Sequence, residues 1–275
     1  MQLTLARTAR RKPGRPPKWL FPDAAVRSYL RWVNGFMAKF RNQLNDRLVS
    51  RLNEFLADST AVKADGWADS VEQVIADLQL WADEELKGSE NIALTLAQEV
   101  ATFNLAQYKK VANSLFGIDP IGKEPWLEEE MKSFAKTNAK LIKSVPQKAL
   151  WEIEERVMTG VRGGVSVKSL QKDIMSRYNV AKSRAQLIAR DQVGKLNGQL
   201  TKSRQKDLGV DKYIWRTSLD RRVRGTPGGL NPTARHSHYA REGKVFSWDK
   251  PPPDGHPGEP IQCRCYAEPV IEGLD

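Results

Sequence analysis

Apolar residues recur at steps of three and four along most of the first 208 positions, which is the spacing of one face of an α-helix. The clearest stripe consists of Val26, Tyr29, Leu30, Val33, Phe36, Phe40, Leu44, Leu48, Leu52 and Phe55. Basic side chains occupy the opposite face of the same segment. The pattern therefore predicts a long amphipathic helix over 23–57, followed by helices over about 67–87 and 90–116.

Proline and glycine divide the next stretch into shorter predicted helices. Pro125 and the three glutamates that follow Leu127 are typical of a helix N-terminus, where proline fits and acids face the positive end of the helix dipole. Pro146 is expected to open a further helix, because proline interrupts a helix from within. The pair Gly163-Gly164 predicts a turn, and two more helices are expected over 166–178 and 181–208.

The composition changes after Gly209. Residues 213–217 and 244–248 are rich in aromatic and β-branched side chains and predict two short strands, with glycine and proline between and after them. The expected fold class is a predominantly α-helical N-terminal part with a small C-terminal α+β domain. The expected domains are an extended arm over 1–22, a helical domain over 23–120, a helical segment over 121–208 that leads into the C-terminal domain, and a small α+β unit over 209–275.

The chain of 275 residues has a formal net charge of +11 and a pI near 9.6. Such a charge favours a polyanionic partner, with nucleic acid before a membrane surface. No apolar run approaches the roughly 20 residues that cross a bilayer, and no apolar stretch follows the basic N-terminus, so neither a membrane span nor a secretory signal is expected. Two cysteines exclude a disulfide framework and fit synthesis in a reducing cytoplasm.

The N-terminal arm combines basic residues with prolines, which favour an extended backbone. Its centre, Lys12-Pro13-Gly14-Arg15-Pro16-Pro17-Lys18, resembles an AT-hook that lies in the minor groove of A·T-rich DNA. The residues expected to bind double-stranded DNA are Arg10, Arg11, Lys12, Arg15 and Lys18. An arm that packs along a neighbouring protein subunit is the alternative.

All three histidines and both cysteines fall within thirty positions near the C-terminus. Imidazole and thiolate suit zinc, so the candidate metal ligands are Cys263, Cys265, His238 and His256. In Cys263-Arg264-Cys265 the two thiols share one face of an extended backbone and can point at one metal ion or into one core. The sequence favours buried thiols and hydrogen-bonded histidines without a cofactor, and a structural zinc ion is the alternative.

The order of residues in the C-terminal part is specific. It contains Trp-x-Thr, then Asp-x-Arg-Val-Arg, then a histidine, Gly-x-x-Phe, a proline-rich loop and Cys-Arg-Cys; the motif residues are Trp215, Thr217, Asp220, Arg222, Arg224, His238, Gly243, Phe246, Cys263, Arg264 and Cys265. This order resembles the C-terminal domain of the phage Mu protein F family of head morphogenesis proteins, over about residues 130–271. The chain departs from the family pattern where the insert 225–235 separates Arg224 from the histidine.

The resemblance implies a phage minor head (capsid) protein that acts in head morphogenesis. Its implied partners are the portal protein and capsid subunits, and its implied location is the capsid interior or portal vertex of the virion, after assembly in the host cytoplasm. The basic arm adds double-stranded DNA, and no membrane partner is expected. Asp220 is expected to pair with Arg222 or Arg224, with Arg264 also within reach.

No catalytic residues are expected, because the sequence shows no nucleophile–base pair and no metal signature of a known chemistry. Two alternatives of other classes stay open. One is a metal-dependent nuclease or toxin-type enzyme that uses the histidines and cysteines, and the other is a DNA-binding regulator that depends on the arm.

Overall fold

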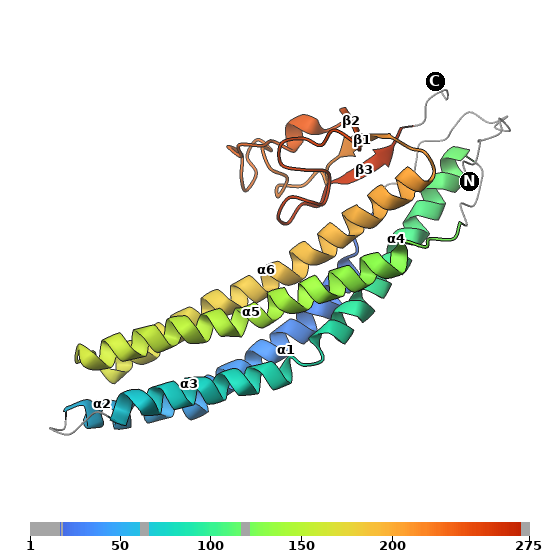
Figure 1. The fold of residues 1–275 in the computed structure, drawn as a ribbon. Coiled ribbons are helices and arrows are strands. Elements are labelled where there is room, and N and C mark those ends of the chain that lie inside the picture. The colour runs from blue at the N-terminus through green and yellow to red at the C-terminus, as the bar shows by residue number, and fades with distance from the viewer. Residues whose placement is uncertain (1–16, 18, 61–65, 117–121, 271–275) are drawn as a thin grey trace. The chain divides into compact units, whose positions relative to one another are not determined.

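A computed structural model describes residues 17, 19–60, 66–116 and 122–270 (Figure 1). Within these residues the helices are α1 (Asp23–Arg47), α2 (Leu52–Thr60), α3 (Gly66–Glu85), α4 (Ser89–Phe116), α5 (Leu127–Arg162) and α6 (Val167–Asp207). Three short strands follow them. The helical N-terminal part and the small C-terminal α+β region confirm the predicted fold class. The five predicted DNA-binding residues of the arm (Arg10 to Lys18) lie outside the described residues.

The predicted helix over 23–57 is interrupted once. Helix α1 ends at Arg47, a 3-10 turn spans Val49–Arg51, and α2 begins at Leu52. The apolar stripe continues through the interruption, since Leu48 and Leu52 are fully buried on either side of it. The turn therefore changes the backbone hydrogen bonding without exposing the stripe.

The prediction that Pro146 opens a helix is wrong, because Pro146 lies inside the single helix α5. Its neighbours Ile142, Val145 and Ala149 are buried on the same side, and this packing outweighs the roughly 3 kcal/mol cost of an internal proline. The two helices expected over 166–178 and 181–208 are likewise one helix, α6. The residues between the two predicted helices include neither proline nor glycine, so nothing there ends it.

The chain forms two compact units, each assembled from segments that are far apart in the sequence. The helical unit comprises 27–94 and 132–189, and the sheet unit comprises the described residues of 1–26, 95–131 and 190–275. Both predicted helical segments, 23–120 and 121–208, contribute helices to each unit.

Aromatic side chains from several helices fill the core of the helical unit. Phe36 of α1 stacks on Trp81 of α3 at 6.0 Å between ring centroids. The hydroxyl of Tyr178, from α6, donates to the backbone oxygen of Met37 at 3.0 Å. Buried Tyr29 hydrogen-bonds Asn138 of α5. These contacts tie α1 to three other helices of the unit.

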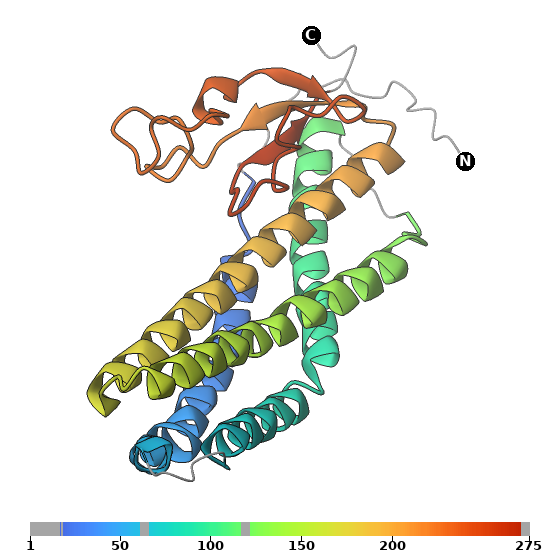
Figure 2. The same cartoon turned by 60° about the vertical axis from the view of Figure 1, so that its left-hand side comes forward.

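The sheet has the order β2-β1-β3 and is antiparallel throughout. Its strands are β1 (Lys212–Arg216), β2 (Val245–Ser247) and β3 (Tyr266–Pro269), and a long irregular segment joins β1 to β2 (Figure 2). Tyr213 and Trp215, two residues apart on β1, have no exposed surface. They share a core with Trp248. Gln205 of α6 connects the helix to this core, because it accepts from the Trp248 indole at 3.0 Å and donates to the Ala267 oxygen at 2.9 Å.

The sequence predicted β1 and β2 but not β3. The four residues of β3 follow a stretch rich in proline and glycine, and their alternation is too short to stand out. Pairing with β1, which places Ala267 opposite Trp215, defines the strand.

A buried histidine–cysteine cluster beside an arginine-lined cavity

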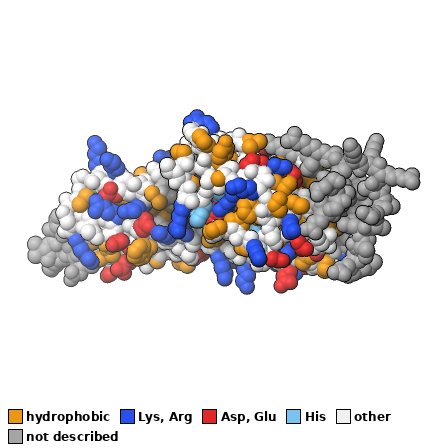
Figure 3. Space-filling model, turned by 90° about the horizontal axis from the view of Figure 1, so that it is seen from above, with side chains coloured by type: hydrophobic (Ala, Val, Ile, Leu, Met, Phe, Trp, Pro, Cys, Tyr) orange, Lys and Arg blue, Asp and Glu red, His pale blue; other side chains and the backbone are white. Residues whose placement is uncertain are grey.

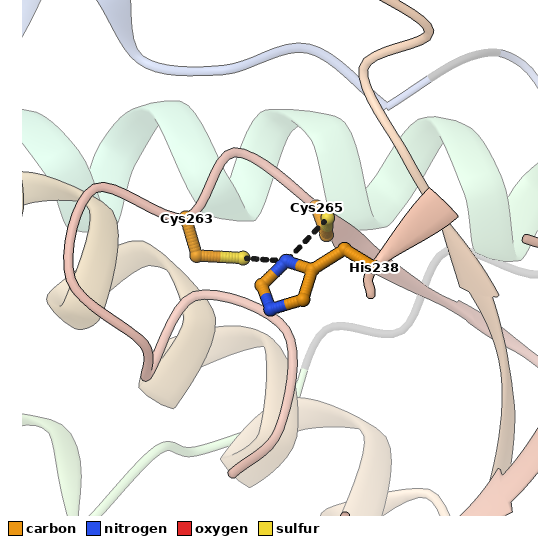
Figure 4. Close-up of side chains that lie close together, drawn as sticks. All are labelled: His238, Cys263 and Cys265. Carbon is orange, nitrogen blue, oxygen red and sulfur yellow. Dashed lines mark hydrogen bonds between the residues drawn. The ribbon is translucent and has the colours of Figure 1, made fainter. Parts of the chain in front are cut away.

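His238, Cys263 and Cys265 converge in the sheet unit (Figure 4). His238 directly precedes the 3-10 turn Tyr239–Arg241, and the two cysteines flank Arg264 just before β3. The Nδ1 atom of His238 lies 3.6 Å from the Cys263 sulfur and 3.5 Å from the Cys265 sulfur. One ring nitrogen therefore faces both thiols, and both cysteines are free.

The backbone that leads into the Cys-x-Cys segment is held against helix α6 at two points. Gln262 adopts a positive φ of 55°, and its N–H donates to the Asp191 carboxylate of α6 at 2.9 Å. On α6, glycine allows the chain to approach closely, since a Cβ on Gly198 would lie 2.7 Å from the Pro257 oxygen. Helix α6 thus supports the loop that carries the thiols.

The opposite edge of the His238 ring meets a carboxylate. Nε2 lies 3.0 Å from Asp254 Oδ2, and Oδ1 of the same carboxylate forms an ion pair with Arg241 at 2.6 Å. The Arg224 guanidinium also lies 3.3 Å from Nε2, but the carboxylate is closer and accepts hydrogen bonds only. This contact assigns the proton of a neutral ring to Nε2 and the lone pair to Nδ1, which faces the sulfurs. Burial raises the pKa of Asp254, but hydrogen bonds from Arg241 and His238 outweigh it and hold that pKa below its usual range.

The two thiols differ in their preference for the charged form. A hydrogen bond from Cys265 lowers the pKa of Cys263 despite its burial, whereas donation to Cys263 and burial raise the pKa of Cys265. The buried indole N–H of Trp215 has no hydrogen-bond partner of regular geometry, although it favours negative charge on the Cys265 sulfur.

His256, the fourth ligand considered from the sequence, does not join the cluster. Its Nδ1 lies 2.9 Å from the Tyr213 hydroxyl, and its ring packs against Trp248 with centroids 4.9 Å apart. Burial lowers the pKa of His256, so the neutral ring accepts the hydrogen bond of Tyr213. His236 is half-buried and is also outside the cluster.

The remaining apolar and small motif residues form the walls of the site. The Trp215 ring meets the His238 ring edge-on at 5.1 Å and Phe246 at 5.8 Å. Thr217 is buried and donates from its hydroxyl and backbone N–H to Glu242, at 2.7 and 2.6 Å. Gly243 has a φ of 75°, which glycine adopts without strain, and its N–H donates to the Trp215 oxygen.

The motif arginines are held by different partners. Arg222 binds Asp220 through two guanidinium contacts, at 2.7 and 3.2 Å, as expected. Arg224 instead donates to the Ile261 oxygen at 2.6 Å. Arg264 lies over the Phe21 ring at 4.9 Å and pairs with Asp23 at 3.6 Å, so its ion-pair partner is Asp23 and not Asp220.

A cavity of about 560 Å³ opens beside the cluster and is lined by His238 and both cysteines. Arg190, Arg222, Arg224 and Arg264 also line it, against the single acid Asp23. Within the described residues, Arg190 and Arg224 form no ion pair with a carboxylate. In the space-filling view, blue side chains lie beside a histidine near the middle of the visible face (Figure 3). The cavity therefore offers a positive lining.

Sequence reasoning missed the residues that orient the cluster. Asp254 lies in a proline-rich loop and Glu242 precedes a glycine, and neither position belongs to a pattern that marks a site. Arg241 lies over the Trp215 ring at 4.8 Å, a contact that the positions of the two residues in the sequence do not predict.

The fold and the site define a helical protein whose small C-terminal α+β region encloses a histidine–cysteine cluster beside a basic cavity. Residues 151–268 match the model of the family described as Phage Mu protein F like protein. This match confirms the resemblance to the phage Mu protein F-like family that was drawn from Trp215 to Cys265. The matched family relates this region of the protein to phage heads.

A relative of this chain is an uncharacterised protein of Haemophilus influenzae, 32% identical over 188 residues. The match covers 67% of this chain and 40% of the relative, so the chain spans less than half of that protein's length. No solved structure gives a significant match. None of the described helices is both long and apolar enough to cross a lipid bilayer.

Proposed function

We propose that the protein is a minor head component that acts in head morphogenesis by docking on the portal protein or a capsid subunit. The observation that carries the proposal is the arginine-lined cavity, whose lining arginines all belong to the region that matches the head-related family. Arg190 and Arg224 line it without a carboxylate partner among the described residues. An acidic side chain of a partner protein would form an ion pair with them. A concave site suits a protruding protein segment better than a DNA duplex.

The test is incorporation into proheads. The full chain carrying an epitope tag is produced in cells that assemble the phage head, and proheads are isolated and analysed by mass spectrometry and cross-linking. The expected result is a few copies per prohead, cross-linked to the portal protein or a capsid subunit. Absence from both proheads and virions contradicts the proposal.

A charge reversal at the cavity tests the docking surface itself. Arg190 is exposed and lines the cavity, so Arg190→Glu is expected to reduce incorporation strongly. Arg31→Glu makes the same change at an exposed position of α1 in the helical unit and is expected to leave incorporation unchanged. Equal incorporation of the two variants would exclude the cavity as the docking surface.

Double-stranded DNA is proposed as a second partner through the basic arm. The net charge of +11 and the run of basic residues from Arg10 to Lys18 support it. DNA affinity is expected to fall steeply as salt rises, because bound cations are released from the phosphates. Full affinity after deletion of residues 1–22 would exclude the arm as the main contact.

A metal-dependent nuclease is the second candidate function, since the histidine–cysteine cluster lines the same cavity. A nuclease assay on purified protein supplied with zinc, compared with a His238→Ala variant, separates it from the assembly function. We expect no cleavage from either protein. Cleavage that depends on His238 would establish the enzyme instead.

A further inference from the structure

We propose that His238, Cys263 and Cys265 form a zinc site, with Nδ1 and the two sulfurs as ligands. The inference is independent of the proposed head function. Its first support is distance: the sulfurs lie 3.6 and 3.5 Å from Nδ1. In a tetrahedral site with Zn–S near 2.3 Å and Zn–N near 2.0 Å, the nitrogen–sulfur separation is about 3.5 Å. The three ligand atoms all lie within 4.8 Å of one another.

The donor set is the one that zinc prefers, and the histidine is oriented as a ligand. Asp254 accepts the hydrogen bond of Nε2 at 3.0 Å, so the lone pair of Nδ1 points toward the two sulfurs. Ligating histidines generally donate their other N–H to a carboxylate or a carbonyl oxygen, which fixes the ring and raises its basicity. The ion pair with Arg241 holds that carboxylate in turn.

The surroundings favour sulfur in its metal-bound, anionic form. Trp215 is fully buried, and its indole N–H has no partner of regular geometry. A metal thiolate at Cys265 is a better acceptor for this N–H than a neutral thiol. The buried aromatic residues Tyr213 and Trp248 share a core with Cys263, so apolar groups cover one side of its side chain.

The site has three protein ligands and not the four considered from the sequence. Among the described residues no further histidine, cysteine or carboxylate joins the group, and His256 is engaged by Tyr213. The fourth position therefore belongs to a water molecule or to a partner's donor from the cavity that the three ligands line. Zinc at this place clamps the segment around His238 to the segment that leads into β3.

Binding is balanced by proton release. Two thiols lose their protons as Zn–S bonds form, and the neutral imidazole contributes its lone pair without losing one. Acid competes with the metal for the sulfurs, so the apparent affinity weakens as the pH falls. Proton release measured in a weakly buffered titration is a readout that does not depend on any activity of the protein.

The experiment uses the full chain purified under reducing conditions. Metal analysis is expected to find about one zinc ion per chain. After exchange with Co²⁺, a thiolate-to-cobalt charge-transfer band and intense visible bands of tetrahedral cobalt are expected. Their absence from folded wild-type protein, or a protein that binds no zinc while both thiols are reduced, overturns the proposal.

Variants assign the ligands. His238→Gln and Cys265→Ser are expected to lose bound zinc, whereas the matched change His256→Gln is expected to keep it. If His256→Gln abolishes binding while His238→Gln does not, the assignment is wrong. Should the ligand variants fail to fold, the cobalt spectra of the wild type and of His256→Gln still test the proposal. A thiolate-to-cobalt band in both proteins supports the site, and its absence from both contradicts it.

Discussion

The Nε2 atom of His238 lies 3.0 Å from Asp254 Oδ2, while Nδ1 of the same ring faces the sulfurs of Cys263 and Cys265. One imidazole thus joins the proline-rich loop to the segment before β3. The carboxylate favours the proton on Nε2, and the Nδ1 atom that faces the thiols then has a free lone pair.

Asp254→Asn is expected to weaken zinc binding about 10- to 100-fold, the usual effect of removing a carboxylate that orients a ligating histidine. The amide keeps the size of the side chain but loses the charge that holds His238 and Arg241. The measurement is a competition titration with a chromophoric chelator, with circular dichroism to confirm folding. Asp249→Asn, at a carboxylate that pairs with Lys206 on the surface, is the control and should leave the affinity unchanged. Equal affinities of the two variants would contradict the orienting role.

Glu124→Ala is expected to lower the free energy of unfolding by about 3 kcal/mol, because it leaves the buried guanidinium of Arg204 without its charge partner. Arg204 is 2% exposed and binds both oxygens of Glu124, at 2.6 and 2.9 Å. Urea denaturation followed by circular dichroism measures the change. Lys39→Gln removes one partner of the exposed pair with Glu85 and should cost less than about 1 kcal/mol. A similar loss of unfolding free energy in both variants would show that the buried Arg204 pair stabilises the protein no more than the exposed pair.

Two helical glycines are expected to respond oppositely to alanine. A Cβ at Gly198 would lie 2.7 Å from the Pro257 oxygen, so Gly198→Ala should destabilise the protein by about 1–3 kcal/mol through overpacking. No atom lies within 4 Å of a Cβ at Gly35, so Gly35→Ala should stabilise α1 by about 0.5–1 kcal/mol. Thermal unfolding of the two variants checks the signs. A stabilising Gly198→Ala would mean that the loop does not lie against α6.

His256 is expected to make stability depend on pH in the weakly acidic range. Burial holds its pKa below the unfolded value of about 6.5, so its contribution is present above that value and is lost as the pH falls through the folded pKa. Protonation also ends the hydrogen bond that Nδ1 accepts from Tyr213. The free energy of unfolding should decline from about pH 7 to about pH 5 and should decline less in His256→Gln. A slope in His256→Gln equal to that of the wild type would contradict the role of His256.

The sequence determined the parts of this protein that depend on local spacing. The apolar stripe of α1 and the strands around Trp215 and Phe246 follow from helical or strand periodicity. Cys263 and Cys265 lie just before β3, and their i, i+2 spacing lets both sulfurs face Nδ1 of His238. The bidentate pair of Asp220 and Arg222 is local for the same reason. The ordered motif also indicated the family whose model matches residues 151–268.

Only the tertiary structure decided the relationships that cross the chain. In the folded chain His238 lies beside the thiols, whereas His256 hydrogen-bonds Tyr213, although an imidazole of either residue could bind a metal ion. Asp254, which contacts His238, lies in a loop whose sequence shows no recognisable pattern. Pro146 stays inside α5 because the packing of its neighbours outweighs the cost of a proline within a helix. Periodicity specifies which face of an element a side chain occupies, whereas the partner on that face depends on how distant segments pack, and that information is spread over the whole core.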